Sequence, residues 1–178
     1  YADVNFDLLG EVIEKVSGES LSWAYAHYIL QPLGLSQTYL PEKAEDQVPE
    51  TYLQGERIHR PQFIRSTKAS GGLVSTAKEL RIFLQAFFQG TLFPKKHLLG
   101  ERRPLQLSFY PILYSQGFMC VPVKKPFGER VTLLGHMGST GSFAFYCPEK
   151  DRYLVGDFPQ LDAPSFALRQ IMRLVVKL

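Results

Sequence analysis

The sequence predicts an α+β fold, made of a helical subdomain, an antiparallel sheet and a C-terminal helix. Apolar residues recur at helical spacing through much of the first 90 residues. From about residue 115 the sequence pattern changes to short runs of β-favouring residues broken by Gly and Pro. A strongly apolar stretch with helical spacing ends the chain. Helices followed by consecutive strands, without regular alternation, are typical of α+β domains.

Three helices are predicted in the first half of the chain. The first covers residues 5–17 and stops at Gly18, and the second begins near Ser20 and is closed by Pro32 and Gly34. Residues 36–70 show no periodicity and are expected to be irregular. A capping box, Thr76-Ala-Lys-Glu79, starts the third helix, which Gly90 ends.

The second half is predicted to form a meander of short strands and one helix. The expected strands are residues 116–123, 130–136, 141–147 and 152–158. The last helix starts at Pro164, with Asp162 as a possible cap and with Ile171 and Val175 among its apolar positions. The shift in composition near residue 112 predicts two units, a helical subdomain over 1–112 and the C-terminal part of an α/β domain over 113–178.

Composition excludes several classes of function. The chain has 178 residues and a formal charge of +3, and its basic residues are scattered, which is unlike a nucleic-acid footprint. Cys120 and Cys147 lack metal-ligand spacing and are expected to be buried, although a disulfide between them stays open. No apolar run has the roughly 20 residues of a membrane helix. The first residue is Tyr1 and not Met, so we expect the natural N-terminus to lie upstream.

Four short stretches carry motifs in a collinear order. They are Tyr1-Ala-Asp-Val-Asn-Phe-Asp-Leu-Leu-Gly10, Gln31-Pro-Leu-Gly-Leu35 with Thr38, Ala69-Ser-Gly-Gly-Leu-Val-Ser-Thr76, and Gly135-His-Met-Gly138 followed by Gly141 and Phe143. Together they resemble the serine β-lactamase and penicillin-binding-protein-like family, which includes class C β-lactamases, D-alanyl-D-alanine carboxypeptidases, D-aminopeptidases and related esterases. The resemblance implies a partial β-lactamase/transpeptidase-like fold and acyl transfer to a serine, at the junction of a helical and an α/β domain.

The resemblance assigns roles to two residues at the start of the chain. Tyr1 matches the family tyrosine that exchanges protons with the nucleophile and the leaving group, although a frayed terminal aromatic is the alternative. Asp3 stands where the family has an Asn that binds substrate. A carboxylate only accepts hydrogen bonds, whereas an amide also donates, so substrate choice is open at this position. Asp3 also fits the N-cap of the helix over 5–17.

Three further assignments come from the third motif. His136 occupies the place of a lysine in β-lactamases, while esterase and aminopeptidase relatives often carry histidine. This difference argues against efficient β-lactam hydrolysis, and an imidazole there can lend partial positive charge near neutral pH. Gly138 would let a substrate lie against the strand. The backbone N–H of Ser139 would be one of two oxyanion donors, and the second would come from the nucleophile's own residue.

The family nucleophile lies in a Ser-x-x-Lys segment upstream of the tyrosine, so the resemblance places it outside this sequence. Ser75-Thr-Ala-Lys78 fits the bare pattern, but it lies after the tyrosine motif at the start of a helix, and we interpret Ser75 as structural. The chain alone is therefore expected to be inactive. The last helix is expected to be exposed, because the absent part would supply the surface that covers it.

The sequence is compatible with two functions from different classes. The first is a fragment of a serine hydrolase that acts on amide or ester bonds, and the second is a non-catalytic peptide-binding or protein-interaction module. Metal-dependent hydrolysis is poorly supported, because the four histidines lack ligand spacing with acidic residues. The expected partners are a small acyl or peptide-like substrate and the missing N-terminal segment or another chain. No cofactor is implied, and only the resemblance suggests a location outside the cytoplasm.

Overall fold

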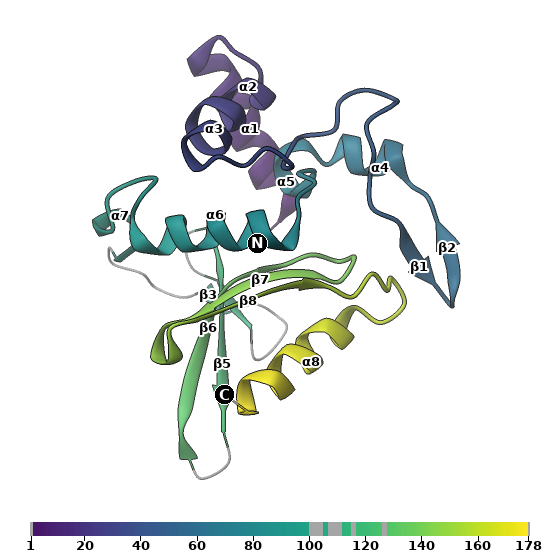
Figure 1. The fold of residues 1–178 in the computed structure, drawn as a ribbon. Coiled ribbons are helices and arrows are strands. Elements are labelled where there is room, and N and C mark those ends of the chain that lie inside the picture. Colours follow the sequence, from purple (N-terminus) through teal and green to yellow (C-terminus); the bar gives the residue numbers. More distant parts are fainter. Residues whose placement is uncertain (1, 100–104, 107–111, 115–116, 126–127, 178) are drawn as a thin grey trace.

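Helices and an antiparallel sheet form separate layers, as an α+β fold requires. The computed structural model describes residues 2–99, 105–106, 112–114, 117–125 and 128–177. The helical part lies on one side of the sheet, with α6 along the sheet face, and α8 covers the opposite face (Figure 1). None of the helices in these ranges is long and apolar enough to cross a membrane.

The first helices follow their predicted starts and stops. Helix α1 (Asp3–Ser17) ends at Gly18, whose φ of 73° lets its N–H reach the carbonyl of Glu14. Ser20 caps α2 (Leu21–Tyr25) by accepting a hydrogen bond from the N–H of Trp23 at 3.1 Å. A π-helical turn, Ala26–Leu30, and α3 (Gln31–Leu33) continue this helix.

The expectation that residues 36–70 are irregular is wrong in part. Strands β1 (Thr51–Leu53) and β2 (Glu56–Ile58) form a hairpin, and helices α4 (Pro61–Ser66) and α5 (Lys68–Gly71) follow. The hairpin turn needs positive φ at both of its central residues, Gln54 (53°) and Gly55 (83°). Gln is not a residue that usually marks such a turn, so the sequence pattern gave little sign of it.

The predicted capping box before α6 (Ala77–Gln89) is half formed. Thr76 Oγ1 accepts the N–H of Glu79 at 3.2 Å, as expected. The Glu79 carboxylate turns away and accepts the N–H of Gln37 at 3.0 Å and the hydroxyl of Thr38 at 2.6 Å. This side chain therefore ties the loop at 37–38 to the start of α6.

The four predicted strands form consecutive strands of the sheet, from β5 to the edge strand β8. Within the described residues the strand order is β3-β4-β5-β6-β7-β8, and every neighbouring pair is antiparallel. The bounds are β3 Leu105–Gln106, β4 Leu113–Tyr114, β5 Met119–Lys124, β6 Arg130–Met137, β7 Ser142–Cys147 and β8 Arg152–Asp157; the short helix α7 spans Lys96–Leu99. Cys120 pairs with Leu134, which pairs with Tyr146, so Cys147 lies on the opposite face of the sheet from Cys120.

The expectation that the terminal helix is exposed is wrong. Helix α8 (Pro164–Lys177) packs on the sheet, and Ile171 and Val175 are 0% exposed, like Leu133 and Phe145 beneath them. The sheet in this chain is wide enough to cover the apolar face of the helix without further polypeptide.

Exposed apolar surface lies instead on α1. Leu9, Val12 and Val16 are 57%, 54% and 83% exposed, at positions that recur at helical spacing. A contiguous apolar helix face of this kind usually marks a contact surface.

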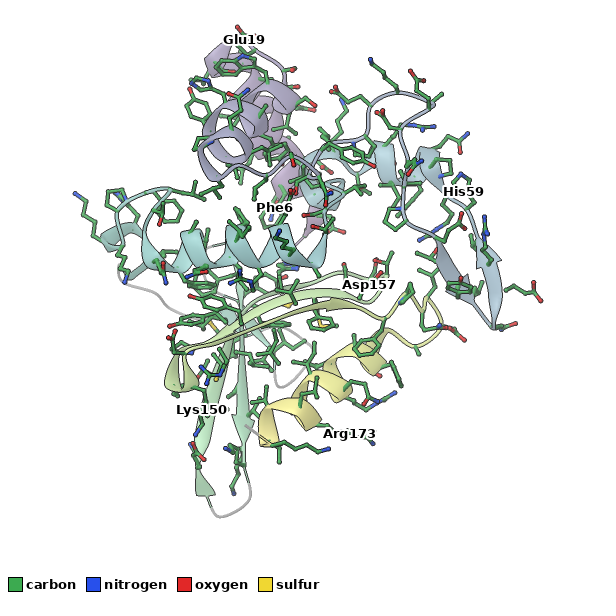
Figure 2. The ribbon with its side chains drawn as sticks, in the orientation of Figure 1. Phe6, Glu19, His59, Lys150, Asp157 and Arg173 are labelled. Atoms are coloured by element: carbon green, nitrogen blue, oxygen red, sulfur yellow. The ribbon has the colours of Figure 1, made fainter. Side chains whose placement is uncertain are left out.

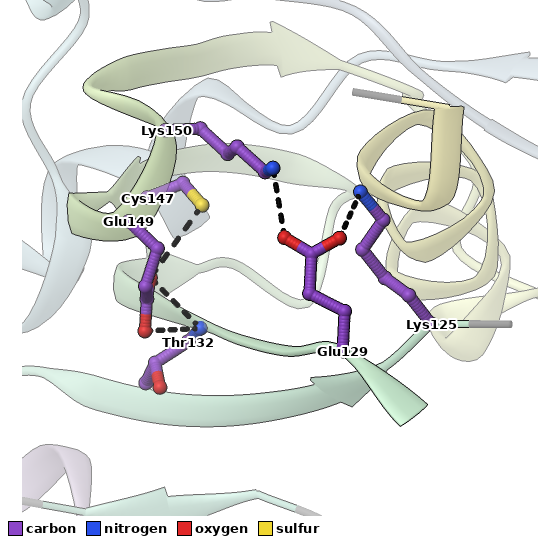
Figure 3. A network of polar contacts seen from close by, with 6 residues as sticks. All are labelled: Lys125, Glu129, Thr132, Cys147, Glu149 and Lys150. Carbon is purple, nitrogen blue, oxygen red and sulfur yellow. Dashed lines mark hydrogen bonds and ion pairs between the residues drawn. The ribbon is translucent and has the colours of Figure 1, made fainter. Parts of the chain in front are cut away.

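Polar contacts tie the β5–β6 hairpin to the short 3₁₀ turn Pro148–Lys150 after β7 (Figure 3). The Glu129 carboxylate lies between the ammonium groups of Lys150, at 2.7 Å, and Lys125, at 3.0 Å. The Glu149 carboxylate accepts the N–H of Thr132 at 3.1 Å. The turn after β7 is thereby fixed to the neighbouring strand.

Candidate functional site

A cavity of about 390 Å³ lies between the helical layer and the sheet. Its helical walls are mainly apolar, with Ile29, Leu35 and Phe83 among them. Thr140 and Asp157 line its sheet side, and Figure 2 shows Asp157 where the sheet meets the helical layer. An apolar cavity with a few polar groups at one side is the usual form of a small-molecule site.

Strand β6 directs His136 toward the helical layer. His136 pairs with Ala144 on β7, and Ala144 pairs with Val155 on β8. Paired residues in a sheet point to the same face, and Val155 lines the cavity, so His136 lies on the face that carries the cavity wall.

Both nitrogens of the His136 ring have partners. Nδ1 lies 2.9 Å from the carbonyl oxygen of Met137, and Nε2 contacts the hydroxyl of Tyr114. A carbonyl only accepts, so Nδ1 carries the proton and Nε2 of the neutral ring accepts from Tyr114. Burial lowers the pKa of His136, although the hydrogen bond to Met137 and the charge of Asp3 act in the opposite direction. The neutral imidazole is therefore the stable form at neutral pH.

The turn after β6 presents backbone groups at the edge of the cavity. The N–H of Gly138 donates to the carbonyl of Ser142 at 2.8 Å, and a Cβ at Gly138 would lie 2.7 Å from Ser142 Oγ. Ser139 is exposed, and within the described residues none of the turn and loop hydrogen bonds uses its N–H. Since Thr140 and Ser142 line the cavity, this turn lies beside it.

Asp3, another predicted site residue, lies at the start of α1. The helix begins with Asp3, and Ala2 is the N-cap residue without a side-chain cap, so the alternative of Asp3 as N-cap is wrong. Asp3 is exposed, and its charge acts on His136. In the structure, Asp3 is therefore close enough to His136 for its negative charge to influence the pKa of the imidazole. Tyr1 lies outside the described residues.

Sequence reasoning missed Tyr114 and Asp157. Tyr114 belongs to a two-residue strand that the pattern did not predict, and it contacts His136 across 22 positions of sequence. Asp157 ends a predicted strand but matches no motif. Desolvation raises the pKa of Asp157, and a backbone hydrogen bond from Phe158 opposes this rise. The contact with His136 identifies Tyr114, and the cavity lining identifies Asp157.

The geometry around Ser75 fits a structural role. Its Oγ lies 2.7 Å from Oγ1 of Thr38 and 3.3 Å from the carbonyl oxygen of Thr76. Thr38 in turn donates to Glu79, whose side chain is buried. Lys78, the other half of the pattern, is exposed on α6.

Comparison with solved structures gives the same overall fold. The D-stereospecific amidohydrolase from Streptomyces sp. matches 91% of this chain with 26% identity and a TM-score of 0.70. The octameric penicillin-binding protein homologue from Pyrococcus abyssi matches 99% with 26% identity and a TM-score of 0.72. D-amino acid amidase from Ochrobactrum anthropi SV3, complexed with D-phenylalanine, matches 100% with 19% identity and a TM-score of 0.77. The chain spans 50%, 42% and 61% of these proteins, respectively.

The match to a protein family covers most of the sequence. The sequence model of the family described as Beta-lactamase matches residues 1–161, which include all four motif stretches. The solved relatives, among them a penicillin-binding protein homologue, agree with this match and with the partial β-lactamase/transpeptidase-like fold. The chain belongs to the Beta-lactamase family.

Proposed function

We propose that this chain is part of a serine hydrolase that cleaves amide or ester bonds through an acyl-enzyme. The nucleophile would come from a Ser-x-x-Lys segment outside this sequence. Tyr1 would exchange protons with the nucleophile and the leaving group, and the N–H of Ser139 would be one oxyanion donor. Asp3, His136 and Gly138 would face the substrate.

The observation that carries this proposal is the turn after β6. It places a backbone N–H without a partner in the described residues, that of Ser139, beside a cavity of about 390 Å³. An N–H of this kind, in a turn that directly follows a strand and next to a space for the acyl group, would suit an oxyanion site.

Amides of D-amino acids are the first substrates to test. Two relatives are described as a D-stereospecific amidohydrolase and a D-amino acid amidase. A neutral His136 supplies no cation at the C-terminal end of β6 to bind a carboxylate, which is a further reason to prefer neutral amides and esters over penicillins.

The proposal requires a partner segment. The Ser75 hydroxyl is hydrogen-bonded to Thr38, and Lys78 is exposed on α6, which supports a structural role for Ser75 rather than that of an activated nucleophile. We propose that the segment with Ser-x-x-Lys, from the same polypeptide or from another chain, lies against the exposed apolar face of α1.

The test compares this chain with a form extended upstream of Tyr1. Both are incubated with a p-nitrophenyl ester, D-phenylalanine amide and a fluorescent penicillin, followed by intact mass measurement. We expect ester and amide turnover and an acyl adduct only in the extended form, unchanged by Ser75→Ala. Turnover by the short chain that Ser75→Ala abolishes would overturn the proposal, and so would an inactive, folded extended form that carries Ser-x-x-Lys.

A non-catalytic interaction module is the second candidate, and the apolar face of α1 favours it. Leu9 and Val12 are more than half exposed on this face. If the chain acts by binding alone, Val12→Lys abolishes association with the partner polypeptide in sedimentation, whereas Glu11→Lys on the same helix does not. Turnover by the extended form would exclude this candidate.

The division at residue 112 also remains a proposal. It would separate the helical subdomain, 1–112, from the sheet with α8, 113–178. Helix α6 packs on β7 and β8, so the proposed boundary does not coincide with a gap in packing.

A further inference from the structure

Three groups lie in a row at the end of β6: the Tyr114 hydroxyl, the His136 ring and the Met137 carbonyl. The carbonyl fixes the proton on Nδ1, because it has no proton to donate. Nε2 is then an acceptor, and the Tyr114 hydroxyl is its donor. The Met137 carbonyl therefore determines which group donates in both hydrogen bonds: Nδ1–H donates to Met137, and the Tyr114 hydroxyl donates to Nε2.

The Tyr114 side chain is held firmly in place. It is 4% exposed and belongs to the main apolar core, together with Val121 and Leu133. Its ring meets the His136 ring at 66° with centroids 5.6 Å apart, an edge-on contact. A phenol packed in this way has few other rotamers, so its hydroxyl stays near Nε2.

We propose that Tyr114 is a positioning residue that holds His136 as the neutral Nδ1–H tautomer, with both ring nitrogens occupied by the protein. In this arrangement His136 shapes the site and supplies a dipole. It does not supply a cation or a free nitrogen for proton transfer.

The substrate class follows, and this step rests on the proposed function. A substrate carboxylate near the end of β6 would meet neither a cation nor an open N–H from His136, and the negative charge of Asp3 lies in the same neighbourhood. Loss of charge-assisted hydrogen bonds to a carboxylate is costly in a partly buried site. The site therefore selects acyl groups that are neutral or cationic where they meet β6.

Histidine nitrogen NMR tests the tautomer without any need for activity. The chain has four histidines, and His136→Gln identifies the signal of interest. At pH 7.5 we expect a protonated Nδ1 and an unprotonated, hydrogen-bonded Nε2. Tyr114→Phe should shift the Nε2 resonance while Nδ1 stays protonated. The matched control is Tyr153→Phe, a tyrosine of the same sheet that stacks on Tyr146. It should leave both resonances unchanged.

A protonated Nε2 at pH 7.5, or an Nε2 resonance that Tyr114→Phe leaves in place in a folded variant, would overturn the proposal. If the extended form is active, Tyr114→Phe should lower kcat/KM for a neutral amide by about tenfold, which is the effect of losing one hydrogen bond to the imidazole. An inactive extended form would count against the proposed function alone, because the NMR result still decides the role of Tyr114.

Discussion

Gly141 occupies a position that only glycine tolerates, at the turn beside the cavity. Its φ is 101°, and a Cβ there would lie 1.8 Å from the carbonyl oxygen of Phe158. We expect Gly141→Ala to lower the free energy of unfolding by about 1–3 kcal/mol through overpacking, in addition to the cost of positive φ. Urea denaturation measures this loss.

Gly55→Ala is the matched control for that substitution. Gly55 also has a positive φ, 83°, but an added Cβ would have no atom within 4 Å. This variant should lose only the conformational term, about 1–2 kcal/mol. Equal losses at Gly55 and Gly141 would show that the contact with Phe158 is not tight.

The Glu79 carboxylate gives stability a defined pH dependence. Burial acts to raise the pKa of Glu79, but hydrogen bonds from Thr38, Gln37 and Ser36 outweigh it, so the pKa is lowered from 4.5. A group with a lowered folded-state pKa stabilises the fold above its unfolded pKa, and the contribution disappears as the pH falls through the folded value. Glu79→Gln should therefore lower Tm at pH 7.

This gap in Tm should close as the pH falls below 4.5, the ordinary pKa of the group. Thermal unfolding monitored by circular dichroism at several pH values measures it, and Glu45→Gln, at an exposed position, serves as the control. A gap that persists unchanged in acid would mean that the carboxylate charge is not what stabilises the loop at 37–38.

The motifs made the turn after β6 predictable as a feature of the fold. Its residues Thr140 and Ser142 line the cavity, and the roles of Gly138 and Ser139 stay predictions. Tyr114 could not be predicted, since its contact with His136 depends on the pairing of β4, β5 and β6, which no local pattern encodes. The state of the His136 ring was also beyond the sequence, because it depends on burial.

In helix α8, the contribution of an apolar residue to stability depends on how deeply its side chain is buried. Ile171 is 0% exposed against the sheet, while Leu174 is 50% exposed on the same helix. We expect Ile171→Ala to cost about 2–5 kcal/mol, as buried truncations do. Leu174→Ala should cost about 0.5–1 kcal/mol. Denaturant titration of both variants tests the contrast, and similar losses would contradict the packing of α8 on this sheet.

Element boundaries were predictable where a residue of special conformation or a cap marks them. Gly18, Gly34 and Gly90 end helices in the left-handed region, and Thr76 caps α6, as expected. The β1–β2 hairpin was missed, because its turn places Gln54 at positive φ. The π-helical turn, Ala26–Leu30, interrupts a helix whose spacing gave no sign of it.

Sequence alone could not say which apolar surfaces meet in the whole molecule. The pattern of α8 and that of α1 both predict burial. The apolar face of α8 is buried against the sheet, whereas Leu9, Val12 and Val16 of α1 are more than half exposed, although α1 also packs on α2 and α5. The helical half and the sheet are joined by aromatic contacts of α6. The ring of Phe88 lies 5.7 Å from Phe118 and 5.1 Å from Tyr146.

These contacts predict that the two halves unfold together. Trp23, the one tryptophan of the chain, reports on the helical half, and far-UV circular dichroism reports on both. The two urea transitions should coincide, as in a two-state protein, because α6 cannot leave the sheet without exposing its aromatic face. Phe88→Ala should separate them, with Trp23 changing first, whereas Phe63→Ala, at a side chain 48% exposed, should not. Separate transitions in the unsubstituted chain would mean that the proposed boundary near residue 112 divides two independent folding units.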